Sequence, residues 1–136
     1  MLPPLRPDGT LPPGIHSATL AELLAAHPPV NEQRQVLNDS VRRAVEELFR
    51  LDPLLVILVD GSYVTRKAEP NDVDILIIST RYTEPKLIAY LDQVCPVEAV
   101  SLDINVEPQI PNRLLDLFTL THTGQAKGIA RVVRQA

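Results

Sequence analysis

The apolar residues of this chain recur first at helical spacing and later at strand spacing. Over residues 32–50 they return every three or four positions, which predicts a long amphipathic helix, and residues 84–94 predict another. Thr19 and Glu22 form a capping box, which predicts a short helix over residues 20–26. The polar residues of the long helix are expected to face solvent: Arg34, Arg42, Arg43, Glu46 and Glu47.

Shorter apolar runs have the length and spacing of strands. The predicted strands cover residues 54–59, 72–79, 100–106 and 128–133. The first is apolar throughout, which is typical of a strand buried on both faces. A short helix over 112–118 and a hairpin over 119–133 are also predicted, and one or two helical turns over 63–67. This order predicts a small α/β (α+β) domain whose mixed sheet carries helices mainly on one side.

The first 30 residues differ in composition from the remainder. Seven of the 13 prolines lie in the first 29 residues, which excludes regular helix or a central strand over most of that stretch. We therefore expect a Pro-rich arm with one short helix over residues 1–30 and a minimal domain over 31–136. His16 is expected to anchor the arm by a hydrogen bond, and a role as a catalytic base is the alternative.

Composition limits the classes of partner. The net charge of −4, the absence of Trp and a total of five Tyr and Phe residues argue against extensive nucleic-acid binding. The longest apolar run, over 54–59, is too short to cross a membrane, and the N-terminus lacks the pattern of a signal peptide. A single cysteine, Cys95, fits a reducing compartment, so a cytoplasmic location is expected.

Candidate chemistry is concentrated between residues 60 and 74. Asp72 and Asp74 are separated by one residue, so on a strand they share a face roughly 6 to 7 Å apart, a spacing that suits divalent cations. Nine residues separate Asp72 from Gly61-Ser62, which offers backbone N–H groups to an anion. Asp103 lies on the polar face of the alternating 100–106 strand. The alternative is ordinary turn and edge-strand carboxylates without a ligand.

The order of these motifs resembles the nucleotidyltransferase superfamily that includes DNA polymerase beta. The resemblance rests on Asp60-Gly61-Ser62, nine residues, and then Asp72-Val73-Asp74-Ile75. It implies that Asp103 is the third carboxylate of the superfamily. A closer resemblance covers almost the whole chain and points to a small bacterial and phage family of polymerase-beta-like proteins. It rests on these segments: Leu11 to His16, Ala18-Thr19, Asp60 to Thr65, Lys67, Pro70, Asp72, Asp74, and Lys127-Gly128-Ile129.

A nucleotidyltransferase reaction would need two metal ions beside a bound NTP. Mg²⁺ or Mn²⁺ would be held by Asp72, Asp74 and Asp103, because paired cations stabilise the entering and leaving oxygens at the α-phosphorus. Gly61 and Ser62 would receive phosphate at the start of a helical turn. Either Arg66 or Lys67 would meet the outer phosphates, although an ordinary solvated loop explains these two side chains equally well.

The acceptor of the nucleotidyl group is not indicated by the sequence. About 80 residues follow Gly61-Ser62, so the acceptor is expected on this domain, on a second copy or on a partner protein. A small molecule, a tRNA end and a protein side chain all remain open. The resemblance suggests one half of a toxin–antitoxin pair. Two other functions stay open: a non-catalytic nucleotide-binding or antitoxin-type regulatory module, and a phosphohydrolase that uses water as the nucleophile.

Overall fold

The computed structural model describes residues 2–67, 70–94, 102–111 and 128–134. Within these residues the helices are α1 (Leu20–Ala26), α2 (Glu32–Leu51) and α3 (Glu84–Val94), and η1 (Ser62–Val64) is a 3-10 turn. The strands are β1 (Ile15–Thr19), β2 (Val56–Asp60), β3 (Val73–Ile78), β4 (Leu102–Glu107) and β5 (Ile129–Val133). In the described part of the chain, no helix is long and apolar enough to cross a membrane.

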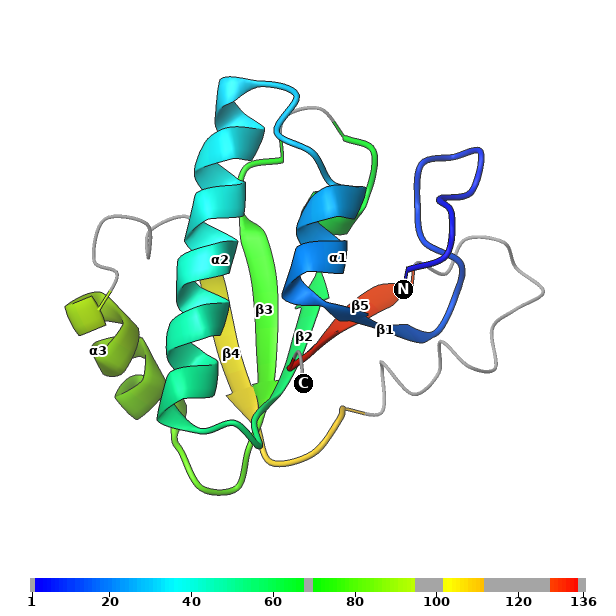
Figure 1. The fold of residues 1–136 in the computed structure, drawn as a ribbon. Coiled ribbons are helices and arrows are strands. Elements are labelled where there is room, and N and C mark those ends of the chain that lie inside the picture. The colour runs from blue at the N-terminus through cyan, green and yellow to red at the C-terminus, as the bar shows by residue number, and fades with distance from the viewer. Residues whose placement is uncertain (1, 68–69, 95–101, 112–127, 135–136) are drawn as a thin grey trace.

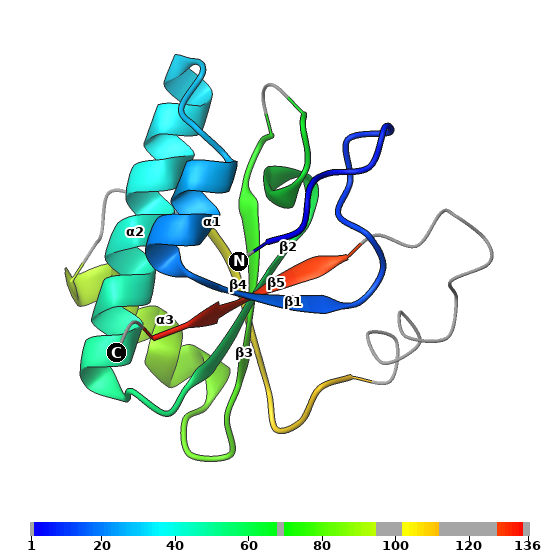
Figure 2. The same cartoon turned by 45° about the vertical axis from the view of Figure 1, so that its right-hand side comes forward.

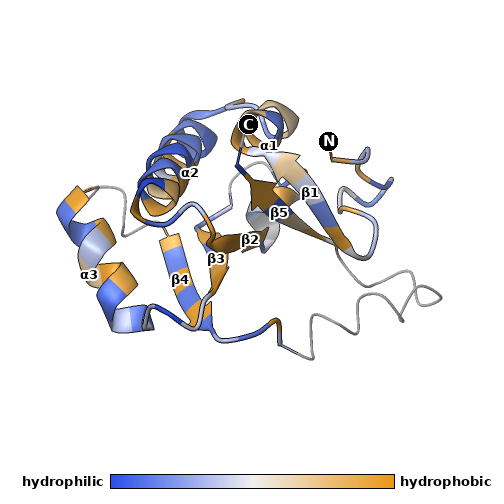
Figure 3. Ribbon diagram, turned by 60° about the horizontal axis from the view of Figure 1, so that its bottom comes forward, coloured by the Kyte–Doolittle hydropathy of each residue, from blue (hydrophilic) through white to orange (hydrophobic). Residues whose placement is uncertain are grey.

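The strands form one mixed sheet in the order β1-β5-β2-β3-β4. The pairs β1–β5 and β3–β4 are parallel, and β2 runs antiparallel to both of its neighbours. All three α-helices lie on the same side of this sheet (Figures 1 and 3). The predicted fold class, a small α+β domain with helices mainly on one side, is therefore confirmed.

The main core lies between α2 and the sheet. The apolar stripe of α2 is fully buried and packs in one cluster with the helix-facing residues of β2 and β3. Members of this cluster include Leu37, Val41, Ala44, Leu48, Ile57, Val59, Ile75 and Ile77. Opposite side chains form a smaller cluster on the other face of the sheet, around Leu58, Leu76 and Ile129. The sheet therefore has one face covered by helices and one that is not.

Local signals explain where the helices begin. The Thr19 side chain accepts a hydrogen bond from the Glu22 backbone N–H while the Glu22 side chain accepts from the Thr19 N–H, which confirms the predicted capping box. Asn31 caps α2 by accepting from the Arg34 N–H at 2.8 Å. Helix α3 has the predicted bounds of 84–94.

Some predicted elements differ from the structure. Strand β2 begins at Val56 rather than at Leu54, because Asp52 accepts a hydrogen bond from the Leu54 N–H in a turn that leaves Leu54 85% exposed. The expected helical turns over 63–67 reduce to η1. Strand β5 agrees with the predicted strand over 128–133. The predicted helix over 112–118 lies outside the described residues. The predicted hairpin over 119–133 is wrong for its last strand, because β5 pairs with β1 on one edge and with β2 on the other.

The arm supplies an edge strand that its proline content did not reveal. Strand β1 pairs in parallel with β5 over its full length, as Figure 2 shows. The Gly128 N–H donates to the Leu11 carbonyl, and a side chain at Gly128 would strike the Pro12 carbonyl oxygen. His16 Nε2 lies 2.8 Å from that same oxygen, so His16 is the hydrogen-bonded anchor that was expected. The division of the chain at residue 30 stays a prediction.

Candidate functional site

Three aspartates from adjacent strands lie side by side on the uncovered face of the sheet. The register places Asp60 of β2 opposite Asp74 of β3, and Asp74 beside Asp103 of β4. Neighbouring strands are about 5 Å apart, so paired residues on one face are close neighbours. We call Asp60, Asp74 and Asp103 the carboxylate row. It lines an open cavity of about 280 Å³ together with Leu58, Ile75, Leu76, Asn105 and Ile129.

The outer aspartates of the carboxylate row place negative charge beside its central member, Asp74. Partial burial, followed by the charges of Asp72 and Asp103, a hydrogen bond with Asp103 and the charge of Asp60, raises the pKa of Asp74 from 3.8 to about 6. Burial disfavours the ionised carboxylate, and neighbouring negative charges do the same. A bound cation would relieve both effects. The electrostatics of the row therefore favour a positively charged ligand.

Gly61 is required at its position for two independent reasons. Its φ of +81° lies in the left-handed region, which side chains other than glycine rarely adopt. A Cβ atom at Gly61 would also strike the Oδ2 atom of Asp74. The turn after β2 therefore brings backbone against the central carboxylate of the row, and only glycine leaves that space open.

The predicted ligands do not all occupy equivalent places. Asp74 and Asp103 are neighbours in the row, whereas Asp72 is exposed, precedes β3 and does not line the cavity. Asp72 still lies close enough for its charge to raise the pKa of Asp74. Asp60 was not among the predicted site residues. The available signal was its place two residues after Leu58 on the same face of a strand that ends at the Gly61 turn.

A metal ion was expected among these carboxylates. Across residues 2–67, 70–94, 102–111 and 128–134, no three His, Cys, Asp or Glu side chains are grouped so that they could hold a metal ion. The side-chain positions of the row thus do not by themselves form a ligand cluster. The donor chemistry nevertheless fits Mg²⁺ or Mn²⁺, since both prefer carboxylate oxygens, and burial together with the neighbouring aspartates raises the pKa of Asp74.

The family comparison covers nearly all of the chain. The model of a family described as a family of unknown function (DUF6932) matches residues 3–133. The chain belongs to this family. No curated protein and no solved structure matches it. The matched range includes the arm, all five strands and the carboxylate row, so in this DUF6932 protein the arm belongs to the same family unit as the sheet.

The two basic residues predicted to meet phosphate lie outside the cavity of the carboxylate row. Arg66 and Lys67 are exposed and do not line the cavity of the row. They line two other hollows, one shared with Gly9 and Thr10 of the arm and another with His27. The Arg66 N–H donates to the Gly9 carbonyl at 2.8 Å, so the arm contacts the predicted phosphate-binding segment directly.

Proposed function

We propose that this protein is a metal-dependent nucleotidyltransferase that moves NMP from an NTP to an acceptor. The observation that carries the proposal is the carboxylate row, in register across three strands and next to the positive-φ turn at Gly61. The motif order of the sequence supports the same assignment, because Gly61-Ser62 precedes Asp72 and Asp74 by the spacing of the superfamily it resembles. A reducing, cytoplasmic setting is proposed from the single cysteine.

The proposed reaction divides into roles for the chain's own residues. Asp74 and Asp103, assisted by Asp72, would hold Mg²⁺ or Mn²⁺ ions, which when bound stabilise the charge that develops at the α-phosphorus. Gly61 would let a phosphate approach the backbone. The acceptor oxygen forms a bond to the α-phosphorus. The bond between the α-phosphorus and the oxygen that bridges it to the β-phosphorus breaks at the same time. Pyrophosphate leaves, and the acceptor's proton passes to a carboxylate of the row.

Several classes of molecule could serve as the acceptor of the nucleotidyl group. A hydroxyl or phosphate of a small molecule, a tRNA end or a partner protein's side chain would serve, and a second copy of the chain could provide it. The proposal retains the toxin–antitoxin pair as a setting in which one protein modifies another. This suggestion rests on the resemblance alone.

Two observations favour a second candidate function. Arg66 and Lys67 line hollows other than that of the row, and no group of three candidate ligands closes on a metal within the described part of the chain. Both facts fit a regulatory module that binds a nucleotide without catalysing a reaction. Such a module would bind NTP through the basic segment without transferring a nucleotidyl group.

Incubation with each α-labelled NTP, Mg²⁺ or Mn²⁺ and cell lysate tests the proposal. Transfer of label by the parent protein and its loss in Asp74→Asn is the expected result. Glu46→Gln is the matched control, because Glu46 is an exposed carboxylate on α2 that does not line the cavity of the row. Binding of NTP without any transfer would favour the regulatory module, and the absence of both would contradict both functions.

A further inference from the structure

Residues 63–67, which follow the Gly61 turn, are held in place by a buried arginine. Arg34 lies in the first turns of α2, where it was expected to face solvent, yet it is only 3% exposed. Its guanidinium donates to the carbonyl oxygens of Tyr63, Thr65 and Lys67, each at 2.7 Å. The expectation failed because these three carbonyls supply acceptors that the helical pattern does not show.

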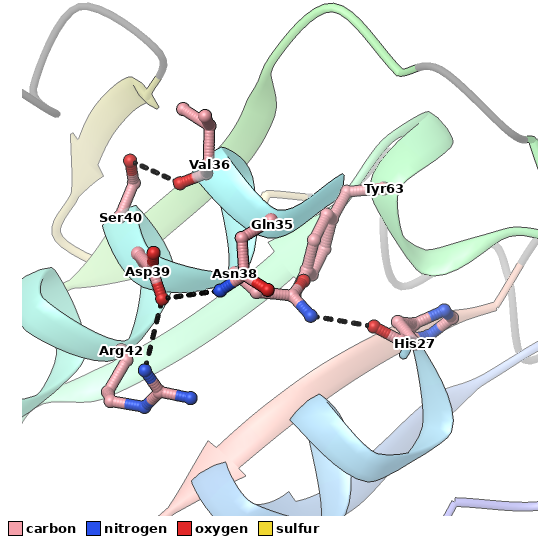
Figure 4. A network of polar contacts seen from close by, with 8 residues as sticks. All are labelled: His27, Gln35, Val36, Asn38, Asp39, Ser40, Arg42 and Tyr63. Atoms are coloured by element: carbon pink, nitrogen blue, oxygen red, sulfur yellow. Dashed lines mark hydrogen bonds and ion pairs between the residues drawn. The ribbon is translucent and has the colours of Figure 1, made fainter. Parts of the chain in front are cut away.

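Other side chains of α2 strengthen this attachment. The Tyr63 hydroxyl donates to Asn38 Oδ1 at 2.6 Å, and the Tyr63 ring lies 5.2 Å from the Arg34 guanidinium. Asn38 is one turn after Arg34 and also donates to the His27 carbonyl, at 2.9 Å (Figure 4). Gln33, the residue before Arg34, donates to the Pro70 carbonyl at 2.8 Å. Helix α2 thus holds both ends of the path from η1 to β3.

The choice of acceptors determines which groups the segment presents outward. Arg34 contacts the carbonyls of residues 63, 65 and 67, so these oxygens point towards α2, while the side chains of Arg66 and Lys67 are exposed. Among the described residues the polar partners of Arg34 are backbone carbonyls, and no carboxylate neutralises its charge. The segment therefore turns its backbone acceptors towards α2 and its two basic side chains outwards.

We propose that Arg34 is the positioning residue of the nucleotide site. Its planar fork fixes residues 63–67, the anchored segment, and thereby fixes where Arg66 and Lys67 lie relative to Gly61 and Asp74. The ligand named here rests on the proposed function, whereas the geometric part rests on the contacts of Arg34 alone. A lysine has three donors on one point charge and cannot reproduce a fork that spans three carbonyls. A lysine at position 34 keeps the positive charge but should therefore fail to position residues 63–67.

Arg34→Lys and Arg34→Gln test the positioning role, with Arg50→Lys as the matched control. Arg50 lies on the same helix, but it is exposed, and its ion pair among the described residues is with Glu47 one turn earlier. We expect amide hydrogen exchange in the anchored segment to rise about tenfold or more in both Arg34 variants and to stay unchanged in the control. Binding of ATP, GTP, CTP and UTP, each with Mg²⁺, should weaken about tenfold or more for the nucleotide that the parent protein binds best.

The Mg²⁺ response separates positioning from a general loss of structure. In the described part of the chain no hydrogen bond joins Arg34 to β2, β3 or β4, which carry the carboxylate row, so the rise in Tm on adding Mg²⁺ alone should survive in Arg34→Lys. Retained metal response with lost nucleotide binding supports the proposal. Full rescue of nucleotide binding by Lys would overturn it, since charge alone would then suffice. Parallel loss of both responses would also overturn it, because Arg34 would then support the fold as a whole.

Failure of the proposed function gives a different result. If the parent protein binds none of the four nucleotides, the nucleotide site and its positioning residue are both rejected, whatever the exchange data show. If the parent protein binds a nucleotide and Arg34→Lys binds it equally well, only the role of Arg34 is rejected. If exchange in the anchored segment is unchanged in both variants, the fork does not fix the segment and the inference is rejected.

Discussion

Replacing Asp74 by Asn should stabilise the metal-free protein at neutral pH. The folded environment raises the pKa of Asp74 from 3.8 to about 6, through burial first and then the neighbouring aspartates. Because the folded pKa lies above the unfolded value, ionisation of Asp74 disfavours the folded state. The free energy of unfolding should therefore decrease as the pH rises from about 4 to 6, and the penalty is fully present above about pH 6.

The size of the penalty follows from the pKa and the exposure. A pKa raised from 3.8 to about 6 corresponds to an upper limit of about 3 kcal/mol. Asp74 is only half-buried, and solvent screening reduces such interactions, so we expect Asp74→Asn to gain about 1 kcal/mol at pH 7.5. At pH 4.5 the gain should shrink to about a third of that value, because the carboxyl is then largely protonated in the folded protein.

Urea denaturation of the parent protein and Asp74→Asn at both pH values measures this gain, with Glu46→Gln as the control. Added Mg²⁺ should reverse the order of stability, since a ligand at a hundred times its Kd stabilises the parent protein by about 2.7 kcal/mol and should do little for the variant. If Asp74→Asn is less stable than the parent protein at pH 7.5 without metal, the repulsion within the carboxylate row has been misjudged. If Mg²⁺ stabilises both equally, Asp74 is not a ligand.

Three further substitutions probe other parts of the structure. Gly61→Ala should lower the free energy of unfolding by about 2 kcal/mol, because of its positive φ and its contact with Asp74; an unchanged value would show that the turn adapts. Burial, with a smaller effect of Arg34, lowers the pKa of His27 to about 4, so the contribution of His27 to stability should fall by about 2 kcal/mol between pH 7 and pH 5, measured in Asp74→Asn to remove the opposite contribution of Asp74. His27→Phe should remove that fall, and its persistence would assign the fall to another group. Thr19→Ala should cost about 1 kcal/mol in the same assay by removing the capping box, and a loss below a few tenths would show that α1 does not depend on it.

The helices could be predicted because their signals are local. The capping box at Thr19 and the apolar spacing of α2 and α3 depend on residues within one or two turns of each other. A short stretch of sequence is therefore enough to predict these helices. Strand β1 has no such signal. It forms because Ile15–Thr19 pairs with Ile129–Val133, more than a hundred residues later, and a window of sequence cannot show that pairing.

The candidate site was predictable in part for the same reason. The alternation of polar and apolar residues placed Asp74 and Asp103 on one face of their strands, and the parallel register of β3 and β4 then made them neighbours. Asp60 was missed because the run over 54–59 predicts a strand buried on both faces, which hides a polar residue at its end. Arg34 was missed because a charged residue in an amphipathic helix is expected outside unless its acceptors are known.

Asp60 changes the balance of charge that the proposed site must satisfy. Two divalent cations would offset Asp60, Asp74, Asp103 and the nearby Asp72, which leaves the charge of a bound triphosphate to be met by basic side chains. Arg66 and Lys67 follow η1 and do not line the cavity of the row, and exposed side chains on a free loop would bind phosphate weakly because of their conformational entropy. Anchoring that segment from behind removes part of this entropy cost. The fourth carboxylate and the buried Arg34 are thus linked: a site with more negative charge needs a better fixed source of positive charge.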